Sequence, residues 1–282
     1  MEISDQLRVE VQKNVATALA EDIGTGDLTA LLSAPGKNAR GSVISREDAV
    51  LCGSAWFDAC FHALDRRATI VWQARDGDAV RAGQTLCEVS ADTRTLLTAE
   101  RTALNFLQLL SGTATVTRSY VDAVAGTDAK IVDTRKTLPG LRLAQKYAVR
   151  TGGGTNHRLG LYDGVLIKEN HIIAAGGVTA AITQARRIAP SNVFIQVEVE
   201  TLAQLKEALA AGATMILLDN MDAEEMREAV KLAGTAAELE ASGGVNLERV
   251  RQIAETGVHR ISIGGLTKDI RAVDLSLRHF EK

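Results

Sequence analysis

The chain has 282 residues, of which 46% are hydrophobic and 24% are charged, as is ordinary for a globular protein with a sizeable core. Its formal net charge is −3, so the molecule as a whole has no field that would gather nucleic acid or an anionic membrane. Any anion that it binds must be held by a local cluster of cations.

The N-terminus, Met-Glu-Ile-Ser-Asp, carries acid where a secretory signal carries basic residues, and no apolar run approaches the roughly 20 residues of a membrane span. We therefore expect a cytoplasmic protein. Cys52, Cys60 and Cys87 do not have metal-ligand spacing and include no Cys-x-x-Cys pair. Reduced thiols in a packed core are the expected state of these residues.

The first part of the chain contains short β-like pieces at 41–45, 68–73 and 84–90, which Asp-Gly and Gly turn signals separate. These pieces indicate a small β-containing domain. A helix is predicted over 99–110, with apolar residues at helical spacing and Gly112 as its stop. The last stretch, 273–280, alternates apolar and polar residues and could return to this domain as a strand.

The C-terminal half repeats a β-rich run, a polar or Gly-containing loop and an amphipathic helix, which implies a parallel sheet. Helix signals include Asn246 as a cap and Gly212 and Gly257 as terminators. The predicted strands are 130–133, 165–168, 193–199, 215–218, 238–240 and 260–263, and the predicted helices are 141–149, 179–188, 202–210, 224–232 and 247–254.

This alternation fits both a closed barrel and an open doubly wound sheet, but the loops favour the barrel. Functional groups at the C-terminal ends of nearly all strands, with glycine loops after the last two, are the barrel pattern. An incomplete barrel and a full eight-stranded one remain equally open. The strand-end groups are Asp133-Thr134-Arg135-Lys136, Lys168-Glu169-Asn170-His171, Glu198 with Glu200, Asp219-Asn220, Ser242-Gly243-Gly244 and Gly264-Gly265.

The segment from Thr134 to Tyr162 contains several basic residues and no Asp or Glu. A solvated helix face explains part of it, because these residues recur at i, i+4 on a predicted helix; they are Arg142, Lys146 and Arg150. The remaining members lie beside Gly or at a strand end, where paired Arg groups suit planar carboxylates; they are Arg135, Lys136, His157 and Arg158.

Lys168 ends an apolar strand, and three roles are open for it: a Schiff base, a point charge for phosphate, or a side chain that merely reaches solvent. Its basic neighbours favour the anion site. Glu198 and Glu200 share one strand face with Gln196, and Asp219 follows on the next strand. These carboxylates could hold Mg²⁺ or face ribose hydroxyls, although Glu200 could equally be balanced by lysines as part of the structure.

Several segments together resemble quinolinate phosphoribosyltransferase, in the right order and over nearly the whole chain. They are Glu21 to Thr29, Glu100 to Phe106, Asp133 to Arg142, Lys146 to Val149, Gly152 to Arg158, Leu166 to His171, Leu218 to Met221 and Glu240 to Gly244. The resemblance implies an α/β protein, with an N-terminal α/β sandwich domain over 1–110, joined by the C-terminal strand 271–282, and a catalytic β/α barrel of about seven strands over 111–270.

The resemblance also implies site roles and partners. The substrates would be quinolinate and phosphoribosyl pyrophosphate, the cofactor Mg²⁺ held mainly by the pyrophosphate, and the assembly an obligate homodimer in which Arg101 reaches across into the partner's site. Arg135, Lys136, His157, Arg158 and Lys168 would surround the dicarboxylate, Glu198 and Asp219 would serve the ribose, and Ser242, Gly243, Gly244, Gly264 and Gly265 would hold phosphate. Catalytic roles would fall to Lys136, Lys168, Glu198 and Asp219.

The chain departs from the family pattern at a few positions. Gln196 stands where Glu is frequent, His259-Arg260 replaces an Asp-aromatic pair, Gly265 replaces Ala, and Asp269 stands where His or Ser is usual. These changes bear on phosphate positioning and leave the base site intact.

The expected reaction is transfer of phosphoribosyl to quinolinate with decarboxylation, in de novo NAD synthesis. Three alternatives stand beside it: a related phosphoribosyltransferase for another aromatic acid, a Schiff-base aldolase that uses Lys168, and a non-catalytic anion-binding protein. The basic residues of the strand-end loops favour the transferase, because both of its substrates are polyanions that need cations to bind.

Overall fold

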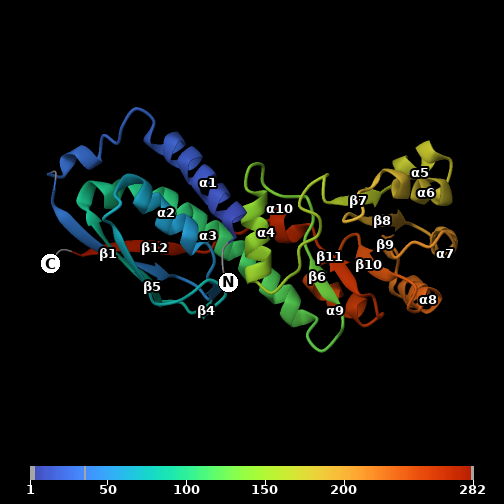
Figure 1. Cartoon of the computed structure of the whole chain (residues 1–282). Coiled ribbons are helices and arrows are strands. Elements are labelled where there is room, and N and C mark those ends of the chain that lie inside the picture. The colour runs from blue at the N-terminus through green and yellow to red at the C-terminus, as the bar shows by residue number, and fades with distance from the viewer. Residues whose placement is uncertain (1–3, 35, 281–282) are drawn as a thin grey trace. The chain divides into compact units, whose positions relative to one another are not determined.

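The computed structural model describes residues 4–34 and 36–280 (Figure 1). The chain forms two compact units. The first contains the described residues up to Arg118, the segment Thr137–Gly153, and the described residues from Thr267 onward, whereas the second contains Ser119–Lys136 and Gly154–Leu266.

The first unit is built on an antiparallel sheet in the order β12-β1-β5-β3, and β2 and β4 form a separate two-stranded sheet. The predicted α/β sandwich domain is confirmed. Its elements are α1 (Asp5–Ile23), the 3-10 turn η1 (Ala30–Leu32), β1 (Asn38–Ser45), β2 (Ala49–Val50), α2 (Ser54–Leu64), β3 (Thr69–Trp72), β4 (Ala79–Val80), β5 (Thr85–Asp92), most of α3 (Thr93–Ala123), α4 (Arg142–Thr151) and β12 (Leu275–Phe280).

The predicted return of the C-terminus to this domain is confirmed. Strand β12 pairs antiparallel with β1, in a register that runs from Arg40 opposite Phe280 to Ser45 opposite Leu275. The segment therefore completes a sheet whose other strands lie more than 180 residues earlier in the chain.

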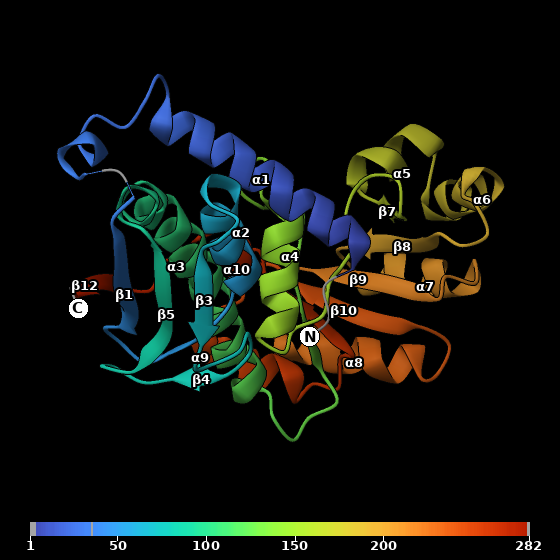
Figure 2. The ribbon, with the colours of Figure 1, turned by 60° about the vertical axis from the view of Figure 1, so that its left-hand side comes forward.

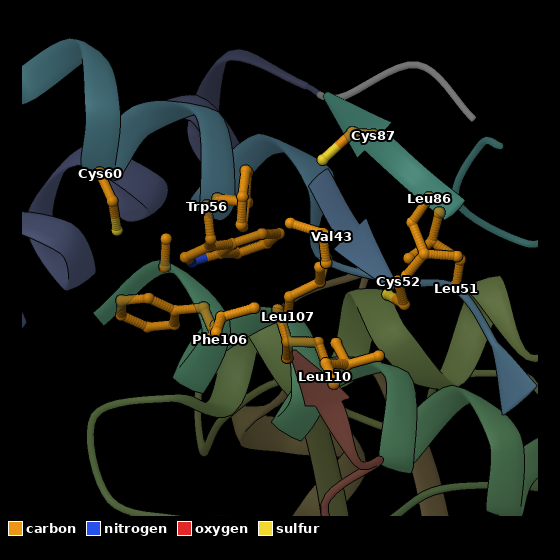
Figure 3. Packing of buried hydrophobic residues seen from close by; sticks show 14 of the residues in the cluster. Val43, Leu51, Cys52, Trp56, Cys60, Leu86, Cys87, Phe106, Leu107 and Leu110 are labelled. Carbon is orange, nitrogen blue, oxygen red and sulfur yellow. The ribbon is translucent and has the colours of Figure 1, made fainter. Parts of the chain in front are cut away.

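The core of the first unit lies among α1, α2, α3 and the sheet. Figure 3 shows Trp56 of α2 and Val43 of β1 packed with Phe106 and Leu107 of α3, and all four are buried. The three cysteines, Cys52, Cys60 and Cys87, are free and buried in this cluster, as predicted. Burial raises the pKa of Cys60 to about 12, so this thiol stays protonated and unreactive.

Helix α3 is longer than predicted, and the expected stop at Gly112 was wrong. The helix continues to Ala123. A Cβ atom at Gly112 would lie 2.3 Å from the carbonyl oxygen of Arg271, so this glycine allows a close approach between backbones and does not end the helix.

The second unit is a parallel sheet with helices, the incomplete barrel that the sequence predicts. Within the described residues its strands follow the order β6-β11-β10-β9-β8-β7, and an isolated parallel bridge joins Val132 of β6 to Thr155. The strands are β6 (Lys130–Val132), β7 (Gly164–Ile167), β8 (Phe194–Val199), β9 (Met215–Asp219), β10 (Glu238–Ser242) and β11 (Arg260–Ser262), so all six predicted strands are present.

Helices follow the strands of the second unit (Figure 2). They are α5 (Glu169–Ala175), α6 (Val178–Ile188), α7 (Leu202–Ala210), α8 (Ala223–Ala233) and α9 (Leu247–Ala254), and α10 (Gly265–Lys268) runs from this unit into the first. Asn246 caps α9 as predicted, because its Oδ1 accepts the backbone N–H of Arg249 at 3.0 Å. Helix α5 was not predicted.

No helix in the described part of the chain combines the length and the apolar character that a membrane crossing requires.

Candidate active site

A cavity of about 340 Å³ lies in the second unit, at the strand-end loops that the sequence singles out. Cations, carboxylates and hydroxyls from most of the parallel strands line it together. The lining residues are Asp133, Thr134, Arg135, Lys136, His157, Arg158, Leu166, Lys168, Glu198, Leu217, Glu240, Ser242 and Ser262. Seven of the predicted site residues are therefore neighbours here: Arg135, Lys136, His157, Arg158, Lys168, Glu198 and Ser242.

Asp133 holds two of the cavity's loops in place. It is fully buried directly after β6, and its carboxylate accepts the backbone N–H of His157 at 2.8 Å and the side-chain amide of Asn156 at 2.6 Å. The backbone N–H of Asp133 donates in turn to the carbonyl of Thr155. The loop that follows β6 and the segment 155–158 are thus tied together, which positions their basic residues over the same cavity.

Arg135 and Arg158 provide two guanidinium groups at one side of the cavity. Burial and the neighbouring charge of Arg135 lower the pKa of Arg158, which also donates to the carbonyl of Gly164 at 2.9 Å. Two cations in a partly dehydrated pocket repel each other, and an anion with two carboxylates would relieve this repulsion. Guanidinium groups also match planar carboxylates by bidentate hydrogen bonds.

Lys136, Lys168 and Glu198 line the other side, and Asp219 at the end of β9 interacts with all three by charge. Lys168 Nζ donates to Glu198 Oε2 at 2.8 Å, and the Glu198 side chain is only 14% exposed. Burial and the charge of Glu198 raise the pKa of Asp219, whereas Lys168, the amide of Asn220 and Lys136 lower it. The four groups predicted to be catalytic are therefore electrostatically coupled.

Helix α5 explains how Lys168 is placed, and the sequence reasoning missed it. The backbone N–H of Lys168 donates to Nδ1 of His171 at 2.9 Å, at the first turn of α5. The signal for it is the acid at Glu169 and a hydrogen-bonding residue three positions after the cap.

The glycine loops permit close approaches around the cavity. A Cβ atom at Gly264 would lie 2.9 Å from Cδ of Lys136, and one at Gly243, where φ is +102°, would lie 2.1 Å from Oδ1 of Asn220. Gly244 also has a positive φ, and Gly265 begins α10. A side chain at Gly264 would thus displace Lys136.

The cavity lining does not include Arg101, Asp219, Gly243, Gly244, Gly264, Gly265 or Glu200. Arg101 is on α3 in the first unit with an exposed side chain, and it makes no hydrogen bond or ion pair with the described residues. Glu200 lies just beyond β8 and is exposed, so Glu198 alone of that pair lines the cavity.

The solvated helix face predicted for Arg142, Lys146 and Arg150 was wrong for Lys146. This side chain is buried, with 2% of the residue exposed, in α4 of the first unit. The i, i+4 spacing places the three residues on one helix face, but it does not tell whether that face meets solvent.

Carboxylates that could approach a cation are Glu198 and Asp219. Among residues 4–34 and 36–280, no group of three or more His, Cys, Asp or Glu side chains could hold a metal ion by itself. A pair of coupled carboxylates suits Mg²⁺, which commonly takes one or two protein carboxylates and completes its shell with water and substrate phosphates.

Comparison with known proteins identifies the family. Residues 27–111 match the family described as quinolinate phosphoribosyl transferase, N-terminal domain, and residues 113–278 match the corresponding C-terminal domain. The chain belongs to the quinolinate phosphoribosyltransferase family. It is therefore a phosphoribosyltransferase by family, as the resemblance implied.

Individual relatives are similar over almost their whole length. The chain is 44% identical to the nicotinate-nucleotide pyrophosphorylase [carboxylating] of Mycobacterium leprae, over 93% of this chain and 95% of that protein. It is 41% identical to the probable enzyme of the same name from Bacillus subtilis, over 95% and 93%. The solved nicotinate-nucleotide pyrophosphorylase of Francisella tularensis has a TM-score of 0.95 and 44% identity, and the match covers 99% of this chain and 98% of that one.

Proposed function

We propose that this chain transfers the phosphoribosyl group of phosphoribosyl pyrophosphate to quinolinate, with loss of carbon dioxide, giving nicotinate mononucleotide and pyrophosphate. This is the reaction of de novo NAD synthesis that its family performs. The observation that carries the proposal is the cavity of about 340 Å³, in which predicted basic residues from three separate segments meet the carboxylate of Glu198.

The chemistry divides between the two sides of this cavity. Arg135 and Arg158 would bind the two carboxylates and orient the ring, so that its nitrogen faces C1 of the ribose. Glu198 and Asp219 would stabilise the positive charge that develops at C1 as pyrophosphate leaves. Lys136 and Lys168 would attract the polyanionic substrates, and no covalent intermediate with the protein is required.

The decarboxylation step requires few groups of the protein. Once the ring nitrogen is alkylated, the pyridinium stabilises the electron pair left at C2 as the bond to the 2-carboxylate breaks and carbon dioxide departs. A proton from water then takes the place of the carboxylate at C2. The site then needs only to hold the ring by its other carboxylate and to exclude competing reactions.

Mg²⁺ is proposed as the cofactor, and it would neutralise the charge of the leaving pyrophosphate. Glu198 and Asp219 offer the oxygen atoms that would approach it, and their coupling with Lys136 and Lys168 keeps this side of the cavity close to neutral. Serine and glycine loops at Ser242, Gly243, Gly244, Gly264 and Gly265 are proposed to hold the phosphates.

We also propose a homodimer in which Arg101 of one subunit completes the site of its partner. An exposed arginine on a helix whose apolar residues are buried in its own unit is available for such a role. A cytoplasmic location stays a prediction, since plant relatives are described as chloroplastic or mitochondrial.

The Schiff-base alternative loses support in this geometry. Lys168 Nζ lies 2.8 Å from Glu198 Oε2, so attack on a carbonyl carbon would first have to break this contact. The test of the proposed function is release of labelled carbon dioxide from quinolinate labelled at the 2-carboxylate. Release should require both phosphoribosyl pyrophosphate and Mg²⁺, stop on chelation, and match formation of nicotinate mononucleotide. Release without phosphoribosyl pyrophosphate would contradict it.

A further inference from the structure

A chain of hydrogen-bonded polar side chains begins in the wall of the cavity, where His157 and Glu240 line it, and the proposed function gives no role to the contacts within this chain. It joins Arg260 of β11, Glu240 of β10, Gln196 of β8 and His157. Arg260 Nε donates to Glu240 Oε2 at 3.1 Å, Gln196 Nε2 donates to the same oxygen at 3.2 Å, and His157 Nε2 lies 2.8 Å from Gln196 Oε1. Gln196 and Glu240 are 0% and 1% exposed, so water cannot replace a lost partner at low cost.

The contacts determine where the imidazole carries its proton. Nδ1 of His157 lies 2.7 Å from the backbone nitrogen of Arg158, which can only donate. Nδ1 must therefore supply a lone pair, and the proton lies on Nε2, which donates to Gln196 Oε1. The Gln196 amide has only one orientation that accepts from His157 and donates to Glu240. Among the ring's forms, only this neutral tautomer satisfies both contacts.

Gln196 separates the ring from a buried carboxylate. Glu240 Oε2 lies 3.7 Å from Nε2 of His157, and Glu240 Oε1 has no hydrogen-bond partner among the described residues. Without the intervening amide, a carboxylate with spare acceptor capacity would draw a second proton onto the ring. An imidazolium carries a hydrogen on Nδ1 and could no longer accept from Arg158. Arg260 balances the charge of Glu240 from the opposite side.

We propose that Gln196 is a positioning residue that keeps His157 neutral and thereby fixes the backbone of Arg158 at the carboxylate-binding side of the cavity. The inference rests on the proposed function for the identity of the ligand, quinolinate, but its statement about His157 does not. Two further contacts hold His157 in place: Asp133 accepts its backbone N–H, and Phe194 meets its ring edge-on.

The decisive variant is Gln196→Met, which keeps the side-chain length and removes both hydrogen bonds. His157 should then turn to Glu240 and become an imidazolium, and the Arg158 backbone should lose its acceptor. We expect KM for quinolinate to rise about tenfold, because a displaced Arg158 would lose about one of its hydrogen bonds to the ligand, with kcat and KM for phosphoribosyl pyrophosphate changed less than about threefold.

The structural readout is ¹⁵N NMR of the imidazole nitrogens, which separates the two neutral tautomers from the imidazolium. The chain has five histidines, and the signal of His157 is assigned by its loss in His157→Asn. Wild type should show a proton on Nε2 alone, and Gln196→Met should show protons on both nitrogens. Gln196→Glu, which sets a second carboxylate against the ring, should also give the imidazolium and serves if the methionine variant does not fold.

Gln145→Met is the matched control, because Gln145 is also a buried amide with two hydrogen bonds, from Leu138 and to Thr267 in the first unit. Gln145→Met should lower Tm about as much as Gln196→Met does, but it should leave the His157 tautomer unchanged. The proposal is overturned if His157 keeps its wild-type state in Gln196→Met, or if kcat and both KM values change together. If wild type shows the Nε2 tautomer but releases no carbon dioxide, the proposed function fails and the role of Gln196 in holding His157 stands.

Discussion

Lys168, directly after β7, forms an ion pair with Glu198 of the neighbouring strand β8, with Nζ 2.8 Å from Oε2. Half of the Lys168 side chain remains exposed, whereas that of Glu198 is mostly covered. A pair of this kind contributes little to stability, because solvent screens its attraction. Its place beside Asp219 and Lys136 points to substrate binding and charge stabilisation as its role.

Replacing Lys168 should separate activity from stability. In Lys168→Met we expect kcat/KM to fall about 100-fold or more, because a cation facing two polyanions is lost. The free energy of unfolding should change by less than about 1 kcal/mol. Steady-state kinetics and urea unfolding measure the two quantities. Lys206→Met, at an exposed lysine of α7, is the control and should alter neither. A Lys168 variant with near wild-type activity would remove this residue from the site.

The titration of Asp219 should respond in opposite directions to its two neighbours. Burial and the charge of Glu198 raise its pKa, and Lys168 lowers it. Glu198→Gln removes a like charge, so the pKa of Asp219 should fall, whereas Lys168→Met removes a cation, so it should rise. Carboxyl ¹³C NMR of labelled protein follows this residue directly and does not require activity. Shifts of the same sign in both variants would show that the two groups do not act on Asp219 by charge.

Much of this site follows from sequence because its parts are local. Strand-end positions such as Asp133, Lys168 and Ser242 can be read from the alternation of strands and helices, and all three line the cavity. The features that could not be predicted depend on tertiary contacts. At position 112 within α3 a glycine is needed because the backbone of Arg271, far along the chain, lies too close for a side chain.

The buried network escaped the sequence analysis for a related reason. His157, Gln196, Glu240 and Arg260 come from four segments separated by 20 to 44 residues between hydrogen-bonded partners. In the sequence, Glu240, Gln196 and Arg260 are polar residues within three different strands, and His157 lies in a loop. Only the register of β8, β9, β10 and β11 brings them into one line, and periodicity does not specify which polar side chains then face each other.

Asp58 offers a test of stability against pH in the first unit. Burial raises its pKa from 3.8 to about 6, although the hydrogen bond from Trp72 and the charge of His62 oppose the shift. The folded state therefore holds the proton more tightly than the unfolded chain, so the stability that this group contributes at low pH is lost as pH rises through about 6.

Asp58→Asn mimics the protonated form and retains an oxygen for Trp72. At about pH 7 it should raise the free energy of unfolding by about 1 to 3 kcal/mol, and near pH 4 the gain should vanish. Urea unfolding at several pH values measures this difference. Asp122→Asn, at an exposed carboxylate of α3, should bring no gain at either pH. An equal gain at both pH values would show that the ionisation of Asp58 is not its source.

Nicotinate should be a poor substrate if Arg135 and Arg158 each bind a carboxylate. Removal of one carboxylate leaves a partly buried guanidinium without its ligand, at a cost of about 2 to 5 kcal/mol. The measurement is kcat/KM for both pyridine acids with saturating phosphoribosyl pyrophosphate. Comparable values for the two would contradict a two-carboxylate site and favour a transferase for another aromatic acid.

The role of Arg101 in a partner's site can be tested by complementation between two inactive variants. Leu104, Leu107 and Leu110 of the same helix are buried in the core of their own unit, whereas Arg101 is exposed and contacts none of the described residues by hydrogen bond or ion pair. Arg101→Ala and Lys168→Ala should each be inactive. In a mixed dimer one site would carry both lesions and the other neither, so activity should return to about a quarter of wild type when subunits exchange freely.

Lys168→Ala mixed with Glu198→Ala is the control. Both residues line the cavity of their own chain, so each site of a mixed dimer keeps one lesion and activity should not return. If mixed dimers form and activity does not return in the first mixture, Arg101 acts within its own subunit or only in folding.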